Sequence, residues 1–304
     1  MDDKEVKLSE LKNADDVIHY LETQKFKHMK YSHYTNIDAM DSILKNRCLW
    51  LSPLEQCNDL LETDWEGDVC NDFCLCFSAV YSENIPMWYL YGGITGQGVR
   101  LTFGNSMMNK WKNNFQFALK KYDEDGEEET SEIIQPIDVK VRDVLYISKD
   151  ETNQKYRLKY NNQCNNGKFS DYDYKQIRDK YRGFYKELPW FYEKEFRILI
   201  EVTPRISNLV KDDSCYKIAL VINNDVYKEA QILLGPESNI SNLEQYQGIK
   251  QFLLESVPKS QYTNKIKMDL LKKNKRGIIL HKEEWCKKKE WEEIYKYALD
   301  QKWC

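Results

Sequence analysis

Residues 72–80 read DFCLCFSAV, and large apolar side chains take every second position among small ones. The large side chains are Phe73, Leu75 and Phe77, and the small ones are Cys74, Cys76 and Ser78. A period of two is typical of a β-strand that turns one face to an apolar core. The same period recurs in GVRLTFG at residues 98–104, so we expect the chain to bury one face of a sheet.

Segments with helical spacing alternate irregularly with strand-like ones. One apolar stripe consists of Ile37, Met40, Ile43 and Leu44, with Thr35 as the expected cap of that helix. Further strands are predicted at residues 29–34, 48–52, 196–202, 216–222, 231–234 and 278–281, and further helices at 13–26, 82–91, 243–254 and 291–298. Because no regular βαβ alternation emerges, the pattern predicts an α+β fold with a mixed, largely antiparallel sheet and flanking helices.

Composition suggests three regions along the chain. We expect a helical leader at residues 1–28, an α+β domain at 29–240, and a helical and strand extension at 241–304 packed on the same domain. Residues around 122–181 form a polar insertion in that domain. Its acidic start, YDEDGEEET, predicts a solvated loop, and the Asn-, Lys- and Tyr-rich remainder predicts a mobile insertion or helices that pack only through tyrosines.

Net charge, the length of apolar runs and the number of cysteines exclude several classes of protein. A net charge of −4 gives no general attraction to nucleic acids or anionic membranes, although residues 264–276 are locally rich in lysine. No apolar run reaches the length of a membrane-spanning helix, and the start of the chain lacks a secretory signal. Nine cysteines without metal-type spacing indicate reduced thiols rather than disulfides or a metal site. We therefore predict a cytoplasmic protein with no membrane association and no bound metal.

The segment WFYEKEFRILI, residues 190–200, places charged groups at the start of an apolar strand. Strand periodicity puts Glu193, Glu195 and Arg197 on one face, with the two carboxylates about 7 Å apart. That spacing suits one carboxylate that stabilises a developing positive charge and a second that orients a nucleophile. The alternative is a structural strand end whose carboxylates pair with Arg197 or with lysines.

Two further groups could meet a ligand. His33 and Thr35 share a face at a strand end, where both can hydrogen-bond a ribose or an amide. The alternative roles are a neutral histidine under the helix and a helix cap. Ser78 ends its strand, and Trp88 and Tyr91 follow on a short helix, where aromatic rings can stack on a planar base or pack in a core.

Five ordered motifs resemble one bacterial family, domain of unknown function 2971 (DUF2971). The motifs are YSHYTNIDAMDSILKNRCLWLS, CNDLLE, CLCFSAVYSENIPMWYLYGGITGQGVRLTF, WFYEKEFRILI and ILLGPES. The resemblance covers roughly residues 29 to 240. It departs from the family pattern where Ser32 separates Tyr31 from His33, and where Leu60 follows Asn58-Asp59 in place of a proline.

A second, weaker resemblance bears on mechanism. His-x-Thr, a middle Ser or aromatic residue and a late Glu-x-Glu are similar to the three-part signature of ADP-ribosyltransferases. This resemblance implies NAD as a substrate, Glu195 as the ribose-binding catalytic glutamate and Glu193 as the residue that orients the acceptor. The implied NAD-binding residues are His33, Thr35, Ser78, Trp88, Tyr91 and Arg197.

Two functions follow as hypotheses. The first is an NAD-dependent ADP-ribosyltransferase-like enzyme of bacterial conflict or phage defence, whose acceptor is a protein or a nucleic acid. The second is a non-catalytic module of the DUF2971 family that binds a nucleotide or a protein. The second hypothesis predicts that the glutamate is paired internally, for instance with Arg197.

Overall fold

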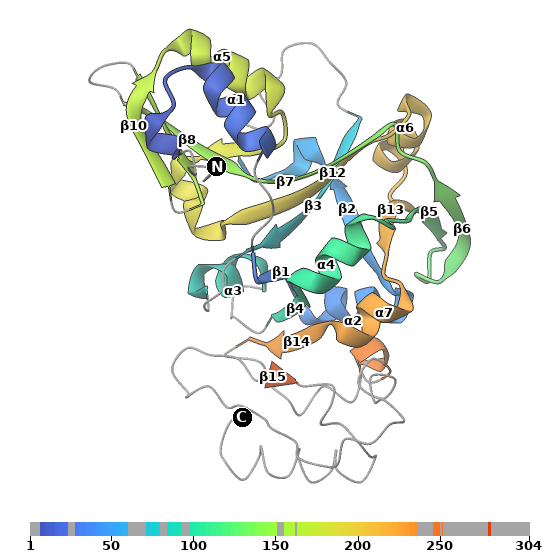
Figure 1. The fold of residues 1–304 in the computed structure, drawn as a ribbon. Coiled ribbons are helices and arrows are strands. Elements are labelled where there is room, and N and C mark those ends of the chain that lie inside the picture. Colours follow the sequence, from blue (N-terminus) through green and yellow to red (C-terminus); the bar gives the residue numbers. More distant parts are fainter. Residues whose placement is uncertain are drawn as a thin grey trace. The chain divides into compact units, whose positions relative to one another are not determined.

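A computed structural model describes residues 7–23, 28–59, 71–79, 84–92, 98–150, 155–161, 163–235, 246–249, 251 and 279–280 of the chain (Figure 1). These residues form helices together with sheets whose strands are largely antiparallel, so the predicted α+β class is confirmed. The predicted helix at 291–298 and the lysine-rich segment at 264–276 lie outside the described residues. None of the helices in the described ranges is long and apolar enough to cross a bilayer.

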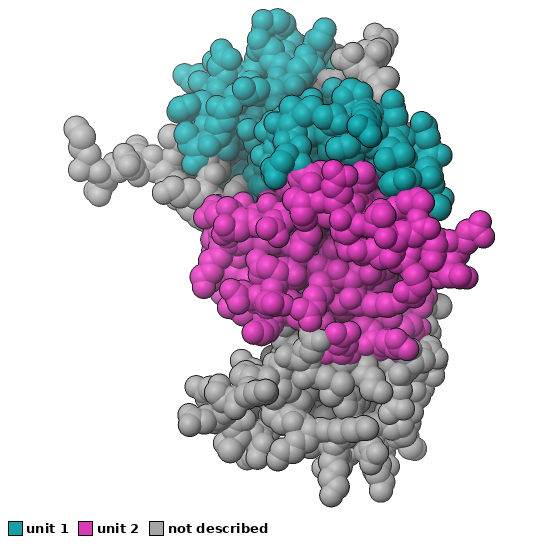
Figure 2. All heavy atoms as spheres, turned by 90° about the vertical axis from the view of Figure 1, so that its right-hand side faces the viewer, with its two compact units in different colours: residues 1–27, 51–76, 135–216 teal, residues 28–50, 77–134, 217–304 magenta. Residues whose placement is uncertain are grey.

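The chain divides into two compact units, each built from three separate segments (Figure 2). Unit 1 contains residues 1–27, 51–76 and 135–216, and unit 2 contains residues 28–50, 77–134 and 217–304. These bounds differ from those of the three regions expected from composition. That three-region scheme stays a prediction, since most of residues 241–304 lies outside the described ranges.

Unit 2 carries helices on antiparallel strand pairs. Its elements are β1 (Lys30–Thr35), α2 (Ile37–Asn46), the start of β2 (Cys48–Pro53), the end of β3 (Asp72–Ser78), α3 (Ile85–Tyr91), β4 (Val99–Gly104), α4 (Asn105–Lys112), β5 (Phe117–Tyr122), β6 (Glu128–Ile134), most of β13 (Tyr216–Val221), α7 (Asn224–Glu229), β14 (Gln231–Leu234) and β15 (Ile279–Leu280). Strand β1 pairs with β4 on one side and, at Ser32, with Ser78 of β3 on the other. Strand β14 also pairs with β4, which places β4 between β1 and β14.

The start of α2 differs by one residue from the prediction. Asn36 is the cap, and its side chain accepts a hydrogen bond from the backbone N–H of Ala39 at 2.7 Å. Thr35 is instead the last residue of β1. The prediction of Thr35 is therefore wrong by one position, because an asparagine side chain satisfies a free N–H at a helix start as well as threonine does.

Unit 1 contains a second sheet and most of the long polar segment. Its elements are η1 (Leu8–Glu10), α1 (Ala14–Thr23), the end of β2, η2 (Leu54–Gln56), the start of β3, β7 (Asp138–Asp143), β8 (Leu145–Asp150), β9 (Lys155–Tyr160), β10 (Gln163–Phe169), α5 (Asp171–Lys180), β11 (Tyr185–Glu187), η4 (Leu188–Glu193), β12 (Glu195–Glu201) and α6 (Pro204–Asp212). Strand β12 pairs antiparallel with β7 and also pairs with β3. Strands β10, β9, β8 and β11 form the second sheet, in which β11 runs parallel to β8.

The prediction for the polar insertion missed its strands, although its acidic turn at 123–127 is largely exposed and α5 is a helix, both as expected. Its acidic start forms a hairpin of β5 and β6, in which Lys120 and Lys121 pair with Glu128 and Glu129 across the strands. Farther along, β9, β10 and α5 contribute buried side chains to the core of unit 1. The expectation of tyrosine packing holds for Tyr156 and Tyr174, whose rings stack 4.2 Å apart, and for Tyr160, whose ring packs edge-on against that of Tyr20 at 6.2 Å.

Candidate functional site

A buried ionic cluster in unit 1 consists of Lys186, Glu193, Glu195 and Arg197. Lys186 Nζ lies 2.7 Å from Glu193 Oε2 and 3.0 Å from Glu195 Oε2. None of the four side chains is more than 5% exposed, and the two cations balance the two carboxylates. Buried charges are stable only when they are paired and hydrogen-bonded, and this cluster meets both conditions.

The backbone around Lys194 makes this convergence on Lys186 happen. Glu193 ends the 3₁₀ helix η4, Lys194 has a left-handed conformation with φ of 42°, and strand β12 begins only at Glu195. The prediction that the strand starts at Glu193 is therefore wrong. Because of the turn at Lys194, Glu193 and Glu195 do not lie on one face of a strand. Their carboxylates instead both contact the ammonium group of Lys186.

Both carboxylate oxygens of Glu195 accept hydrogen bonds from neighbouring side chains. Arg197 Nε donates to Glu195 Oε1 at 2.6 Å, and an Arg197 terminal nitrogen, Nη2, donates to Oε2 at 3.0 Å. Arg197 also donates to the carbonyl of Gly183 at 2.8 Å through Nη1. Burial by itself raises the pKa of the Glu195 carboxyl, but the charges of Arg197 and Lys186 outweigh it and hold that pKa well below its usual value. The internal pairing with Arg197 that the sequence raised as an alternative is thus present.

Side chains from residues 51–76 support the cluster. Lys186 donates to Asn58 Oδ1 at 3.1 Å, and Asp59 Oδ2 accepts from the backbone N–H of Glu187 at 2.7 Å. Neither Lys186 nor these roles of Asn58 and Asp59 could be found from sequence periodicity, because the partners lie 128 positions apart. The Asn-Asp pair in the CNDLLE motif was the only signal available.

Three thiols lie next to this cluster. Cys57 Sγ and Cys74 Sγ are 3.4 Å apart, and a hydrogen bond from Cys76 helps to keep the pKa of Glu195 low. Hydrogen bonds with the Cys57 and Cys76 thiols, together with burial, raise the pKa of Cys74 well above its usual value. In the described ranges, no three His, Cys, Asp or Glu side chains are arranged to hold a metal ion, and Cys70 lies outside those ranges.

The predicted ligand residues of the first half lie in unit 2, on two faces of one sheet. Cross-strand partners share a face, so the pairs of Ser32 with Ser78 and of Tyr34 with Arg100 define one polar face. His33 and Thr35 point to the opposite face, where the His33 ring contacts Phe77 with ring centres 6.0 Å apart. Ser78 therefore faces away from both His33 and Thr35.

The polar face of unit 2 holds a cluster that the sequence did not single out. We call Tyr34, Trp88 and Arg100 the arginine–aromatic cluster. The rings of Tyr34 and Trp88 lie 5.0 Å apart, and the Arg100 guanidinium lies 5.6 Å and 5.8 Å from their respective centres. Arg100 also donates to the Tyr34 hydroxyl at 3.2 Å. The available signal was Arg100 and Thr102 alternating with three apolar residues in GVRLTFG.

Two N–H donors of this cluster have no acceptor. Trp88 Nε1 and Arg100 Nε are both buried, and neither donates a hydrogen bond within the part of the chain that the structure describes. A buried donor without an acceptor costs about 1–3 kcal/mol. Two such donors on adjoining side chains therefore indicate a position for an acceptor-rich group.

The predicted residues thus fall into two groups. Glu193, Glu195 and Arg197 come together in unit 1. His33, Thr35, Ser78, Trp88 and Tyr91 belong to unit 2, where Trp88 contacts Tyr34 and where Tyr91 ends helix α3 partly buried.

Comparison with known proteins relates part of the chain to a family model. No curated protein and no solved structure matches the chain significantly. Residues 87–198 match the model of the family described as "Protein of unknown function (DUF2971)". This stretch includes Trp88, Arg100, Lys186 and the charged residues at 193, 195 and 197. Over these residues the resemblance stated from the motifs is confirmed.

Proposed function

We propose that this chain is a non-catalytic nucleotide-binding module of the DUF2971 family, and that the phosphate and base of the ligand bind at the arginine–aromatic cluster of unit 2. The observation that carries the proposal is the pair of buried donors, Trp88 Nε1 and Arg100 Nε, that have no acceptor in the described residues. Phosphate oxygens are strong acceptors, and a guanidinium group suits them in both charge and geometry.

The aromatic rings of the cluster fit the same ligand class. Trp88 and Tyr34 are 0% and 6% exposed, so the proposal requires a local opening that lets a nucleobase reach one of these rings, while Arg100 supplies the positive charge for the phosphate. The ionic cluster of unit 1 supports the non-catalytic part of the proposal. Both oxygens of Glu195 are held by Arg197, and a carboxylate engaged in this way is poorly placed to hold a ribose.

The test measures binding of AMP, ADP, ATP, NAD and inorganic phosphate to the full chain by calorimetry and by thermal stabilisation. Arg100→Gln removes the charge, and Trp88→Phe removes the indole donor while it keeps an aromatic ring. We expect each change to weaken nucleotide binding by about tenfold or more. The matched control is Arg205→Gln, because Arg205 is exposed in unit 1. The proposal is wrong if no nucleotide binds, or if Arg100→Gln binds as well as the parent chain.

A second candidate function is the NAD-dependent ADP-ribosyltransferase implied by the weaker resemblance. The observation in its favour is the low pKa of Glu195, since a glutamate that stabilises a cationic transition state must be ionised at neutral pH. This hypothesis predicts that the chain releases nicotinamide from NAD, with or without a protein or nucleic-acid acceptor. Glu195→Gln would abolish that release, provided that circular dichroism shows the variant to be folded. NAD binding without nicotinamide release would favour the binding module instead.

A further inference from the structure

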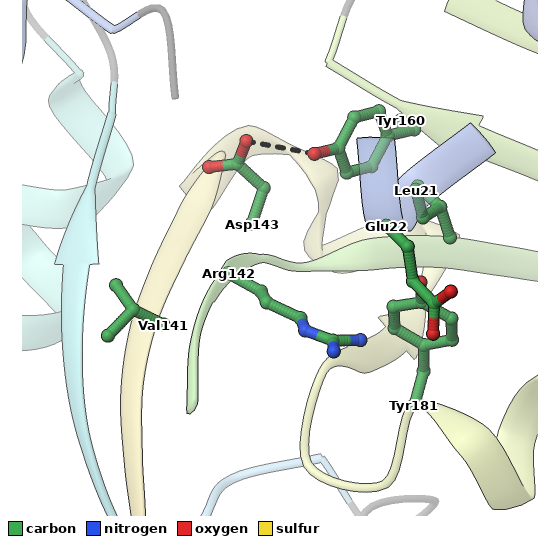
Figure 3. A pocket seen from close by; sticks show the side chains of 7 residues that line it. All are labelled: Leu21, Glu22, Val141, Arg142, Asp143, Tyr160 and Tyr181. Carbon is green, nitrogen blue, oxygen red and sulfur yellow. Dashed lines mark hydrogen bonds between the residues drawn. The ribbon is translucent and has the colours of Figure 1, made fainter. Parts of the chain in front are cut away.

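Unit 1 contains a cavity whose lining residues belong neither to the ionic cluster nor to the arginine–aromatic cluster. It has a volume of about 180 Å³ and is bounded by α1, the end of β7, Tyr160 at the end of β9, and Tyr181 directly after α5 (Figure 3). A cavity of about 150 Å³ is large enough to hold benzene. The cavity in unit 1 is therefore sized for a molecule of roughly six to eight non-hydrogen atoms.

Arg142 presents a positive charge to this cavity. Its guanidinium lies 4.9 Å from the centre of the Tyr181 ring and 6.0 Å from that of Phe184, and Figure 3 shows the side chain extending toward Tyr181. Stacking on the rings fixes the plane of the guanidinium and leaves its N–H groups for an anion. In the described part of the chain, Arg142 forms neither an ion pair nor a hydrogen bond with a carboxylate.

Carboxylates supply the opposite charge in the same cavity. Asp143 is buried, and its Oδ2 accepts a hydrogen bond from the Tyr160 hydroxyl at 3.1 Å (Figure 3). Glu22 of α1 also lines the cavity and pairs with Lys180 at 3.5 Å. The wall of the cavity thus carries one guanidinium and two carboxylates.

This arrangement of charges selects among small ligands. A dianion would be repelled by Asp143 and Glu22, and a simple cation would leave Arg142 without an anion in the cavity. A zwitterion satisfies all three groups, with its carboxylate on Arg142 and its ammonium toward the acidic side chains. The rings of Tyr160 and Tyr181 provide apolar surface for a short side chain.

We propose that this cavity binds a free α-amino acid with a small side chain. The proposal is independent of the nucleotide site, because every residue that lines the cavity belongs to unit 1 whereas the arginine–aromatic cluster belongs to unit 2.

The test measures binding of individual amino acids to the full chain by calorimetry, without any nucleotide. We expect at least one small amino acid to bind, with Arg142→Gln weakening that binding by about tenfold or more. The matched control is Lys140→Gln, which removes an exposed cation from the same strand and should leave binding unchanged. The proposal fails if no amino acid binds at about 10 mM, or if Arg142→Gln binds as well as the parent chain.

A second measurement uses the unaltered chain, so that it does not depend on the folding of a variant. The N-acetylated form of the amino acid that binds lacks the ammonium group, and the corresponding amide lacks the carboxylate. Both should bind at least about tenfold more weakly than the free amino acid. Equal binding of either derivative would overturn the assignment of a zwitterion.

Discussion

At the scale of single residues, the ionic cluster buries four charged side chains in unit 1. Arg197 is the most buried member, with 0% of its surface exposed, and its guanidinium donates to Glu195 and to the Gly183 carbonyl. A buried ion pair adds little net stability compared with a well-packed apolar pair, but removal of one partner leaves an unpaired buried charge. The cluster is therefore more sensitive to single substitutions than to the loss of a whole pair.

Arg197→Met should destabilise the chain by about 3–5 kcal/mol, because Glu195 would lose its bidentate partner. Urea denaturation followed by circular dichroism measures this as a fall in the midpoint. Lys140→Gln, an exposed cation on the neighbouring strand, should change stability by no more than about 0.5 kcal/mol. An unchanged urea midpoint for Arg197→Met would show that the pair of Arg197 and Glu195 does not contribute to the stability of the fold.

The low pKa of Glu195 predicts how stability changes with pH. The pKa is lower in the folded chain than in the unfolded chain, where it is about 4.3, so the ionised carboxylate stabilises the fold above the unfolded value. That contribution is lost as the pH falls below about 4 toward the folded value. The stability difference between the parent chain and Glu195→Gln should therefore be largest near pH 7 and shrink in acid. A difference that stays constant down to about pH 2 would contradict the prediction.

At the scale of elements, short-range periodicity was a good guide wherever one face of a strand is apolar. It placed β3, β13 and β14 within one residue of their observed bounds. It failed for β9, β10 and α5, because their lysine, asparagine and tyrosine side chains hide the period, although Leu158, Phe169 and Ile177 are buried. For the candidate site, the pattern identified Glu195 with Arg197 but not Lys186, since that contact depends on how β11 and η4 return to β12.

Gly183 is a second position, after Lys194, where a left-handed backbone lies next to the ionic cluster. It has φ of +74°, its carbonyl accepts from Arg197, and an added Cβ would lie 2.5 Å from Leu199 Cδ1. Gly183→Ala should therefore destabilise the chain by about 2–4 kcal/mol, from backbone strain and overpacking together.

Gly126 provides the matched control for this substitution. It has a similar φ of +79°, but an added Cβ there would have no atom within 4 Å. Gly126→Ala should cost only the backbone term of about 1–2 kcal/mol. If thermal unfolding shows equal losses for the two variants, the contact with Leu199 contributes nothing to the effect.

At the scale of the whole molecule, neither unit is a continuous stretch of chain. The core of unit 1 combines residues from all three of its segments, for example Val17, Cys74 and Leu199. Strand β12 likewise pairs with β7 from its own segment and with β3 from an earlier one. Folding of unit 1 therefore depends on contacts between residues more than 100 positions apart, which slows folding relative to local contacts.

Residues 135–216 expressed alone should fail to form a stable fold, because they lack α1, β3 and the Asn58–Asp59 support of the ionic cluster. The measurement is the dispersion of amide signals in a nitrogen–proton correlation spectrum, with the full chain as the reference. A well-dispersed spectrum and a cooperative unfolding transition for this fragment would show that the other two segments are dispensable.

The left-handed backbone of Lys194 has a consequence for motif-based inference. The letters Glu-x-Glu are the same whether the middle residue is extended or left-handed, yet the two conformations give the carboxylates different directions. With φ of 42° at Lys194, both carboxylates converge on one ammonium group and neutralise it. The backbone conformation of the middle residue thus distinguishes two carboxylates in an internal salt bridge from two carboxylates that face outward. Searches for enzymes with a Glu-x-Glu motif gain specificity when they include the φ angle of that residue.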